Sequence, residues 1–84
     1  MEDDRLQQAL DVTYKVLSKD ILWEPAYMLQ MEIFHRMGRH SMVHSVFNHC
    51  KQTLEVKNNI PLSSDLTKCY EELTMDEKKP INPS

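Results

Sequence analysis

The sequence predicts an all-α fold in which four helices stack as hairpins. Three observations support this prediction: apolar residues recur at steps of three and four, Gly38 is the only glycine, and 40% of the 84 residues are hydrophobic. Such steps mark the buried face of a helix, and the shortage of glycine excludes most tight β-hairpin turns. The hydrophobic content is enough for one small core, so we expect one domain over residues 1–74. The polar segment 75–84, which contains two of the four prolines, is predicted to be a disordered tail.

The first helix is expected to begin near Asp3, because acidic residues are favourable at a helix N-terminus, and to end between residues 18 and 20. Its wide apolar stripe consists of Leu6, Ala9, Leu10, Val12, Tyr14, Val16 and Leu17. One neighbouring helix does not cover so much surface, and the last helix of a stacked array normally has a polar outer face. We therefore expect this helix to pair with a second copy of the chain or with helices outside it. The residues expected to make this contact are Leu6, Leu10, Val12 and Val16.

The second helix is predicted from Pro25, which is tolerated in a first turn, to Gly38, which ends helices by adopting a left-handed conformation. Its apolar residues form two stripes, so it is expected to pack on both sides as the central element. One stripe contains Ala26, Leu29, Ile33 and Met37, and the other contains Tyr27, Met31 and Phe34. Residues of this helix that belong to neither stripe are expected to contact a partner protein, with ordinary solvent exposure as the alternative. They are Met28, Glu32 and His35, with Arg36 and Arg39 adding charge.

Two further helices are expected after Gly38. Ser41 is predicted to cap the third helix, and the asparagines at 58–59 to end it, because Asn adopts the left-handed conformation more readily than most residues. The link between the second and third helices is short, so these two must form an antiparallel hairpin. Ser63 or Ser64 is predicted to cap a fourth helix, whose inner face holds Leu66, Cys69, Tyr70 and Leu73.

Apolar positions in the first and third helices repeat at an offset of 34 residues. The pairs are Ala9 with Val43, Val12 with Val46, and Val16 with Cys50. This offset equals the period of the tetratricopeptide helical hairpin. By themselves three such pairs are weak evidence for a repeat, because any two amphipathic helices can be aligned in this way.

Several short motifs share one register between residues 9 and 73. They are Ala9-Leu10, Glu24, Ala26-Tyr27 and Gly38-Arg39, followed by Phe47, Leu54, Ser63 and Tyr70. In these features the chain resembles the C-terminal part of the bacterial transcriptional activator domain found in SARP-like transcription regulators. It departs from the family pattern at Val43-His44, where Ala-Leu is usual.

The resemblance implies a tetratricopeptide-like domain for protein–protein interaction and oligomerisation in a cytoplasmic bacterial transcription regulator. It further implies that the partner is a second copy, another regulator subunit or the transcription machinery, and that DNA contacts come from a module not in this chain. The family's domain normally has further helices before the first one here, so we expect a fragment or a minimal stand-alone relative. The alternative is a stand-alone helical-repeat adaptor unrelated to transcription.

The overall charge does not favour a nucleic-acid site, and the apolar runs are too short for a membrane span. The chain has 13 acidic and 10 basic residues and a net charge of −3, whereas gripping a polyanion normally needs a basic excess. Residues 34–53 contain no acidic residue but hold Arg36, Arg39, Lys51 and all four histidines. We interpret this stretch as a solvated helix face, with a basic patch for a partner or a nucleic-acid backbone as the alternative. No apolar run reaches the length needed to cross a membrane.

The residues that carry chemistry do not form a recognisable catalytic or metal-binding motif. His40 and His44 would share one helix face, which leaves a metal or pH sensor as a further alternative function. The close ligand spacings of zinc sites are absent, so no metal and no cofactor are expected. No nucleophile turn or metalloprotease helix is present, so we predict no catalytic residue and no enzyme activity. Cys50 and Cys69 are expected to be buried free thiols.

Overall fold

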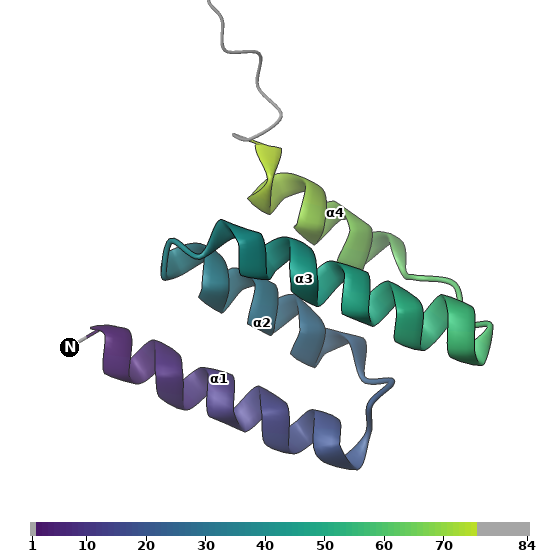
Figure 1. Ribbon diagram of the computed structural model, residues 1–84, viewed down its shortest axis with the longest axis horizontal. Helices are drawn as coiled ribbons and strands as arrows, with labels where there is room; N and C mark the ends of the chain where they lie inside the picture. Colours follow the sequence, from purple (N-terminus) through teal and green to yellow (C-terminus); the bar gives the residue numbers. More distant parts are fainter. Residues whose placement is uncertain (1, 76–84) are drawn as a thin grey trace, which may run out of the picture.

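The computed structural model describes residues 2–75, and these are almost entirely helical (Figure 1). The helices are α1 (Glu2–Lys19), α2 (Glu24–Arg36), α3 (His40–Lys51) and α4 (Ser64–Leu73), and a π-helical turn, Gln52–Val56, continues α3. The described residues include no strand, so the predicted all-α fold of helical hairpins is confirmed. Within the same range no helix is both long and apolar enough to cross a lipid bilayer. The predicted tail lies outside the described residues, apart from Met75.

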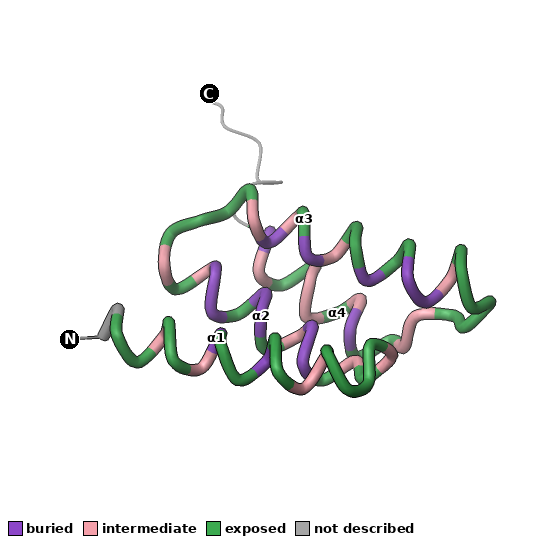
Figure 2. The backbone as a smooth tube through the Cα atoms, turned by 60° about the horizontal axis from the view of Figure 1, so that its bottom comes forward, coloured by how far each residue is buried: buried purple, intermediate pink, exposed green. Residues whose placement is uncertain are grey.

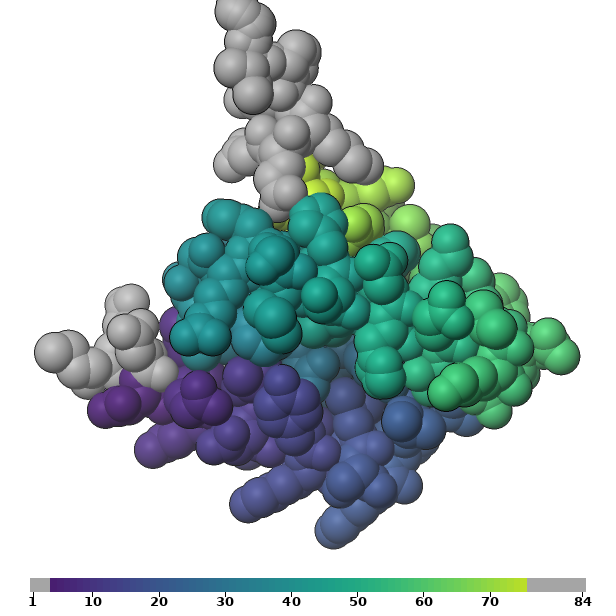
Figure 3. Space-filling model, viewed as in Figure 1, coloured from purple at the N-terminus to yellow at the C-terminus, as the bar shows by residue number. Residues whose placement is uncertain are grey.

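The centre of the fold is α2, as its two apolar stripes predict. It packs most extensively against α3 in an antiparallel hairpin, and it also contacts α1 and α4 (Figure 1). Its fully buried Tyr27 and Met31 join Leu54 and Leu66 at the middle of the core. In the space-filling view α1 lies along one edge of the molecule (Figure 3). The tube view shows that most of α1 is exposed, because in the described chain only α2 packs against it (Figure 2).

Of the residues expected to adopt a left-handed backbone, Gly38 and Asn59 do so, whereas Asn58 remains helical. Gly38 has φ +78° after α2, and Asn59 has φ 56° after the π-helical turn. The N–H of Arg39 then donates to the carbonyl of Phe34 at 2.8 Å, which closes the end of α2 and reverses the chain into α3. The predicted cap at Ser41 is wrong, because α3 begins at His40 and Ser41 is exposed inside its first turn. Arg39 occupies the cap position without a side-chain hydrogen bond to the helix.

The N-terminus of α4 is held from both sides. The Ser63 hydroxyl accepts a hydrogen bond from the N–H of Leu66 at 3.2 Å, which confirms Ser63 as the cap. The N–H of Ser63 donates to Glu24 Oε2 on α2 at 3.2 Å. The carboxylate of Glu55 accepts from the N–H of Leu62 at 3.5 Å. Two carboxylates from different helices therefore position the loop that leads into α4.

Replacing Ser63 with Ala is expected to lower the free energy of unfolding by about 1 kcal/mol, because the N–H of Leu66 loses its acceptor. Urea unfolding followed by circular dichroism measures this change. Ser64→Ala is the matched control: Ser64 is exposed and belongs to the helix itself, so its replacement should change the value by less than about 0.5 kcal/mol. Equal losses for the two variants would show that the cap contributes nothing.

Candidate interaction groove

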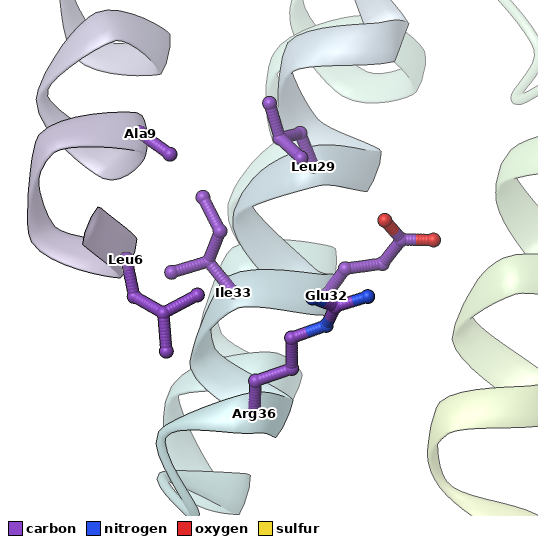
Figure 4. A pocket seen from close by; sticks show the side chains of 6 residues that line it. All are labelled: Leu6, Ala9, Leu29, Glu32, Ile33 and Arg36. Carbon is purple, nitrogen blue, oxygen red and sulfur yellow. The ribbon is translucent and has the colours of Figure 1, made fainter. Parts of the chain in front are cut away.

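A groove with a mainly apolar lining runs along the surface between α1 and α2. Its middle section is a hollow of about 320 Å³ lined by Val12, Thr13, Val16, Trp23, Pro25, Ala26 and Leu29. A second hollow, of about 180 Å³, shares Leu29 and is completed by Leu6, Ala9, Glu32, Ile33 and Arg36 (Figure 4). A third, of about 320 Å³, shares Val16 and Trp23 and adds Lys19 and Asp20. Because neighbouring hollows share residues, they form one continuous surface, which we call the α1–α2 groove.

Large apolar side chains of the groove are exposed to solvent. Val12 is 56% exposed, Trp23 48% and Leu29 39%. Single exposed apolar residues are ordinary on protein surfaces, but a contiguous apolar strip with charged ends is typical of a binding surface. Trp is also among the residues that contribute most to protein–protein binding.

The floor of the groove is fixed by a buried polar contact between the two helices. Thr13 is 2% exposed and Gln30 is 4% exposed. The amide of Gln30 donates to Thr13 Oγ1 at 3.0 Å, and Thr13 Oγ1 donates to the carbonyl of Leu10 at 2.6 Å. Each buried hydroxyl or amide group in this chain of bonds has a partner, so α1 is held in one rotational setting on α2.

The turn between α1 and α2 presents Trp23 at one end of the groove. Asp20 Oδ1 accepts from the N–H of Leu22 at 3.1 Å, and the phenol of Tyr27 donates to the carbonyl of Ile21 at 2.6 Å. Burial raises the pKa of Tyr27 above its usual 10.0, so this phenol stays protonated and remains a donor. The turn that carries Trp23 is therefore anchored to the core.

The residues predicted to contact a partner through α2 do not share one surface. Glu32 and Arg36 are exposed and line the groove. Met28, in contrast, is half-buried and packs against the core. His35 is also half-buried, with its ring centroid 5.3 Å from that of His40. Arg39 is exposed at the hairpin turn, outside the groove lining.

The residues predicted for self-association divide in a similar way. Leu6, Val12 and Val16 line the α1–α2 groove. Leu10 is 4% exposed and belongs to the core. It has almost no surface left for a second chain, because α2 already covers that side of α1.

Two prominent residues of the groove were not predicted. Leu29 was assigned to a buried stripe of the second helix, and that assignment is wrong, because the side chain is 39% exposed. Trp23, which occupies the N-cap position of α2 two residues before Pro25, was given no role. Both side chains line the α1–α2 groove, and only a further helix packed in the groove would bury them.

The histidines are distributed over several contacts rather than gathered around one point. His44 Nδ1 lies 2.6 Å from the hydroxyl of Tyr70 on α4, and Tyr70 also stacks on Phe47 with ring centroids 3.9 Å apart. The ring of His49 lies 6.1 Å from that of Tyr27. The described residues contain no group of three or more His, Cys, Asp or Glu side chains arranged to hold a metal ion.

The two cysteines are free thiols in a protected environment. Cys50 is fully buried, and burial, together with the carboxylates of Glu24 and Glu55, raises its pKa to about 12. Burial also raises the pKa of the half-buried Cys69. A raised pKa disfavours the thiolate, which is the reactive form, so neither thiol has the environment of a nucleophile.

No protein-family model, no curated protein and no solved structure matches this chain.

Proposed function

We propose that this chain is a non-catalytic protein-interaction module that binds its partner in the α1–α2 groove. The observation that carries the proposal is the continuity of the groove, in which Val12, Trp23 and Leu29 are exposed together. Burying apolar surface of this kind contributes about 25 cal/mol per Å² before the costs of association are subtracted. The fixed floor and the anchored turn support the proposal further, because a preorganised surface loses less entropy on binding.

The proposal places this module in a bacterial transcription regulator, on the strength of the sequence resemblance. The groove would then join regulator subunits, as a homo-oligomer, or join the regulator to the transcription machinery. The net charge of −3 fits a role in which DNA contacts are made elsewhere. A stand-alone adaptor unrelated to transcription would use the same groove, so the identity of the bound protein distinguishes the two functions.

Site-specific photo-cross-linking tests the proposal. A benzophenone side chain placed at position 12 or 29 is expected to give a cross-linked product in cells that make the protein, because both positions are exposed in the groove. The matched control is position 48 on α3, where Asn48 is exposed outside the groove, and no product is expected there.

Mass spectrometry of the product identifies the partner. A second copy or a subunit of a transcription complex supports the regulator function, and a protein of another class supports the adaptor function. A folded protein that gives no product at either groove position contradicts the proposed function altogether.

A further inference from the structure

The 34-residue repeat matches α1 with α3 and α2 with α4, and this correspondence indicates which neighbour α1 lacks. In α1, Thr13 bonds to Gln30 of α2. The residue 34 positions later, Phe47 of α3, stacks on Tyr70 of α4, which also contacts His44. Each pair of helices is therefore in contact, although α3 and α4 touch less extensively than α1 and α2 do and through different positions of the repeat. The repeat relates these two pairs of helices, so the remaining neighbour of α3, which is α2, has a counterpart position beside α1.

That counterpart position is the α1–α2 groove. On α3, Val43, Val46 and Cys50 are 1%, 8% and 0% exposed. Their counterparts on α1 are Ala9, Val12 and Val16, and these line the groove, with Val12 56% exposed. Nothing among residues 2–75 lies beside α1 where α2 lies beside α3. A helix in this place would run antiparallel to α1, because α2 runs antiparallel to α3 (Figure 1).

The charges on α1 indicate the chemistry of that helix. Arg5, Lys15 and Lys19 are exposed and fall on the same face as Val12, at helical spacings of seven, three and seven residues. Asp11 accepts a hydrogen bond from Gln7 at 3.1 Å and lies four residues before Lys15, so this one carboxylate is beside that cation. Lys19 lines the groove, and Arg5 and Lys15 lie near Val12 at its α1 edge.

The α2 side and the turn do not cancel this excess. Arg36 adds a cation and Glu32 an anion to the lining of the groove. Asp20 is the other anion of the lining, and it keeps its charge while it accepts from the N–H of Leu22; the cations Arg5, Lys15, Lys19 and Arg36 still outnumber these two anions. A second copy that placed its own α1 here would bring Arg5, Lys15 and Lys19 against the same three cations. Like charges across an interface oppose binding, whereas acidic side chains would complement the groove.

We propose that the α1–α2 groove binds an amphipathic α-helix of a partner protein, antiparallel to α1, with acidic residues flanking its apolar stripe. This inference rests on the proposed function and names the class of partner. The partner helix would lie beside α1 as α2 lies beside α3, so α2 indicates the spacing of apolar residues that it needs. The buried stripe of α2 consists of Tyr27, Met31 and Phe34. The partner helix would present large apolar residues at i, i+4 and i+7 over Val12 and Val16.

Two hydrocarbon-stapled peptides of about fifteen residues test the proposal, since shorter or unstapled helices are marginal in water. Both carry Tyr, Met and Phe at i, i+4 and i+7. One has Glu at the flanking positions and the other has Gln. Fluorescence anisotropy is expected to show at least about tenfold tighter binding of the Glu peptide at low salt, with the difference shrinking as salt screens the charges.

Variants of the chain locate the binding site. Val12→Asp should weaken binding of the Glu peptide by about tenfold or more, because it places a carboxylate in the apolar strip. Tyr14→Asp is the matched control: Tyr14 is 50% exposed on the side of α1 away from the groove, and binding should be unchanged. The double variant Lys15→Glu, Lys19→Glu should remove the preference for Glu over Gln.

The outcomes separate this inference from the proposed function. Equal binding of both peptides, or an unaltered preference in the Lys15→Glu, Lys19→Glu variant, overturns the acidic helix but leaves the groove as a binding site. A sedimenting dimer that Val12→Asp dissociates shows a second copy in the groove, and so also overturns the inference. Cross-links at positions 12 and 29 without binding of either peptide also overturn the inference but leave the groove as a binding site. Absence of both cross-links and peptide binding ends the proposed function itself.

Discussion

Replacing Met31 with Ala is expected to destabilise the protein by about 2–5 kcal/mol, because a buried Met leaves a cavity when it is shortened. Met31 is 0% exposed and lies at the middle of α2, the helix that contacts all three others. Domains of this kind are stable by only about 5–15 kcal/mol, so the loss is a large share of the total. Urea unfolding followed by circular dichroism measures the change.

Met75→Ala is the control for the loss of a Met side chain as such. Met75 is 58% exposed, so its replacement should change the free energy of unfolding by less than about 0.5 kcal/mol. Should the Met31→Ala chain fail to fold, Met31→Leu provides the measurement, with an expected cost below about 1.5 kcal/mol because the volume is conserved. If the variants at positions 31 and 75 are equally stable, α2 is not the centre of the core.

The helices and most of the core could be predicted from the sequence, because helical periodicity specifies which residues share a face. Tyr27, Met31 and Phe34 were assigned to one stripe and are buried together. The ends of helices were predictable where the backbone needs a special residue. Within residues 2–75, Gly38 and Asn59 are the positions with positive φ, and few other residues tolerate that conformation.

Periodicity does not say how many neighbours a helix has, and the groove could not be predicted for this reason. Leu29 occupies an apolar position of α2 but faces the place where no helix lies, so it is 39% exposed. Val12 is apolar and exposed for the same reason, although its counterpart Val46 is buried. The number of neighbours follows from the three-dimensional arrangement, which places α1 at the edge of the molecule (Figure 3).

The buried polar contact under the groove is also invisible in the sequence. Thr13 and Gln30 are 17 residues apart, and neither residue type signals burial. Their pairing depends on the rotation of α1 about its own axis, which the apolar stripe determines only coarsely. The cap at Ser41 failed for a related reason, since the cap position is Arg39 and α3 starts two residues earlier than a cap at Ser41 predicts, following the turn closed by Arg39 and Phe34.

Alkylation of Cys50 by iodoacetamide at pH 8 is expected to be about 1,000-fold slower in the folded protein than in the chain unfolded by urea. The pKa of Cys50 is raised to about 12 by burial and by Glu24 and Glu55, against 9.0 for an exposed thiol. At pH 8 this difference alone lowers the thiolate fraction by about three orders of magnitude, and only the thiolate reacts. Mass spectrometry of the peptide that contains Cys50 gives the rate.

The pH dependence distinguishes a raised pKa from simple steric protection. In the folded state the thiolate fraction of Cys50 grows about tenfold per pH unit up to a pH near 12, so labelling should keep accelerating above pH 9. In urea the rate should level off above the ordinary pKa of 9.0. Cys69, which is only half-buried, is the internal control and should react faster than Cys50 in the folded protein. A Cys50 rate in the folded protein that levels off near pH 9 would contradict the prediction, because the labelled species would then have the ordinary thiol pKa of the opened chain.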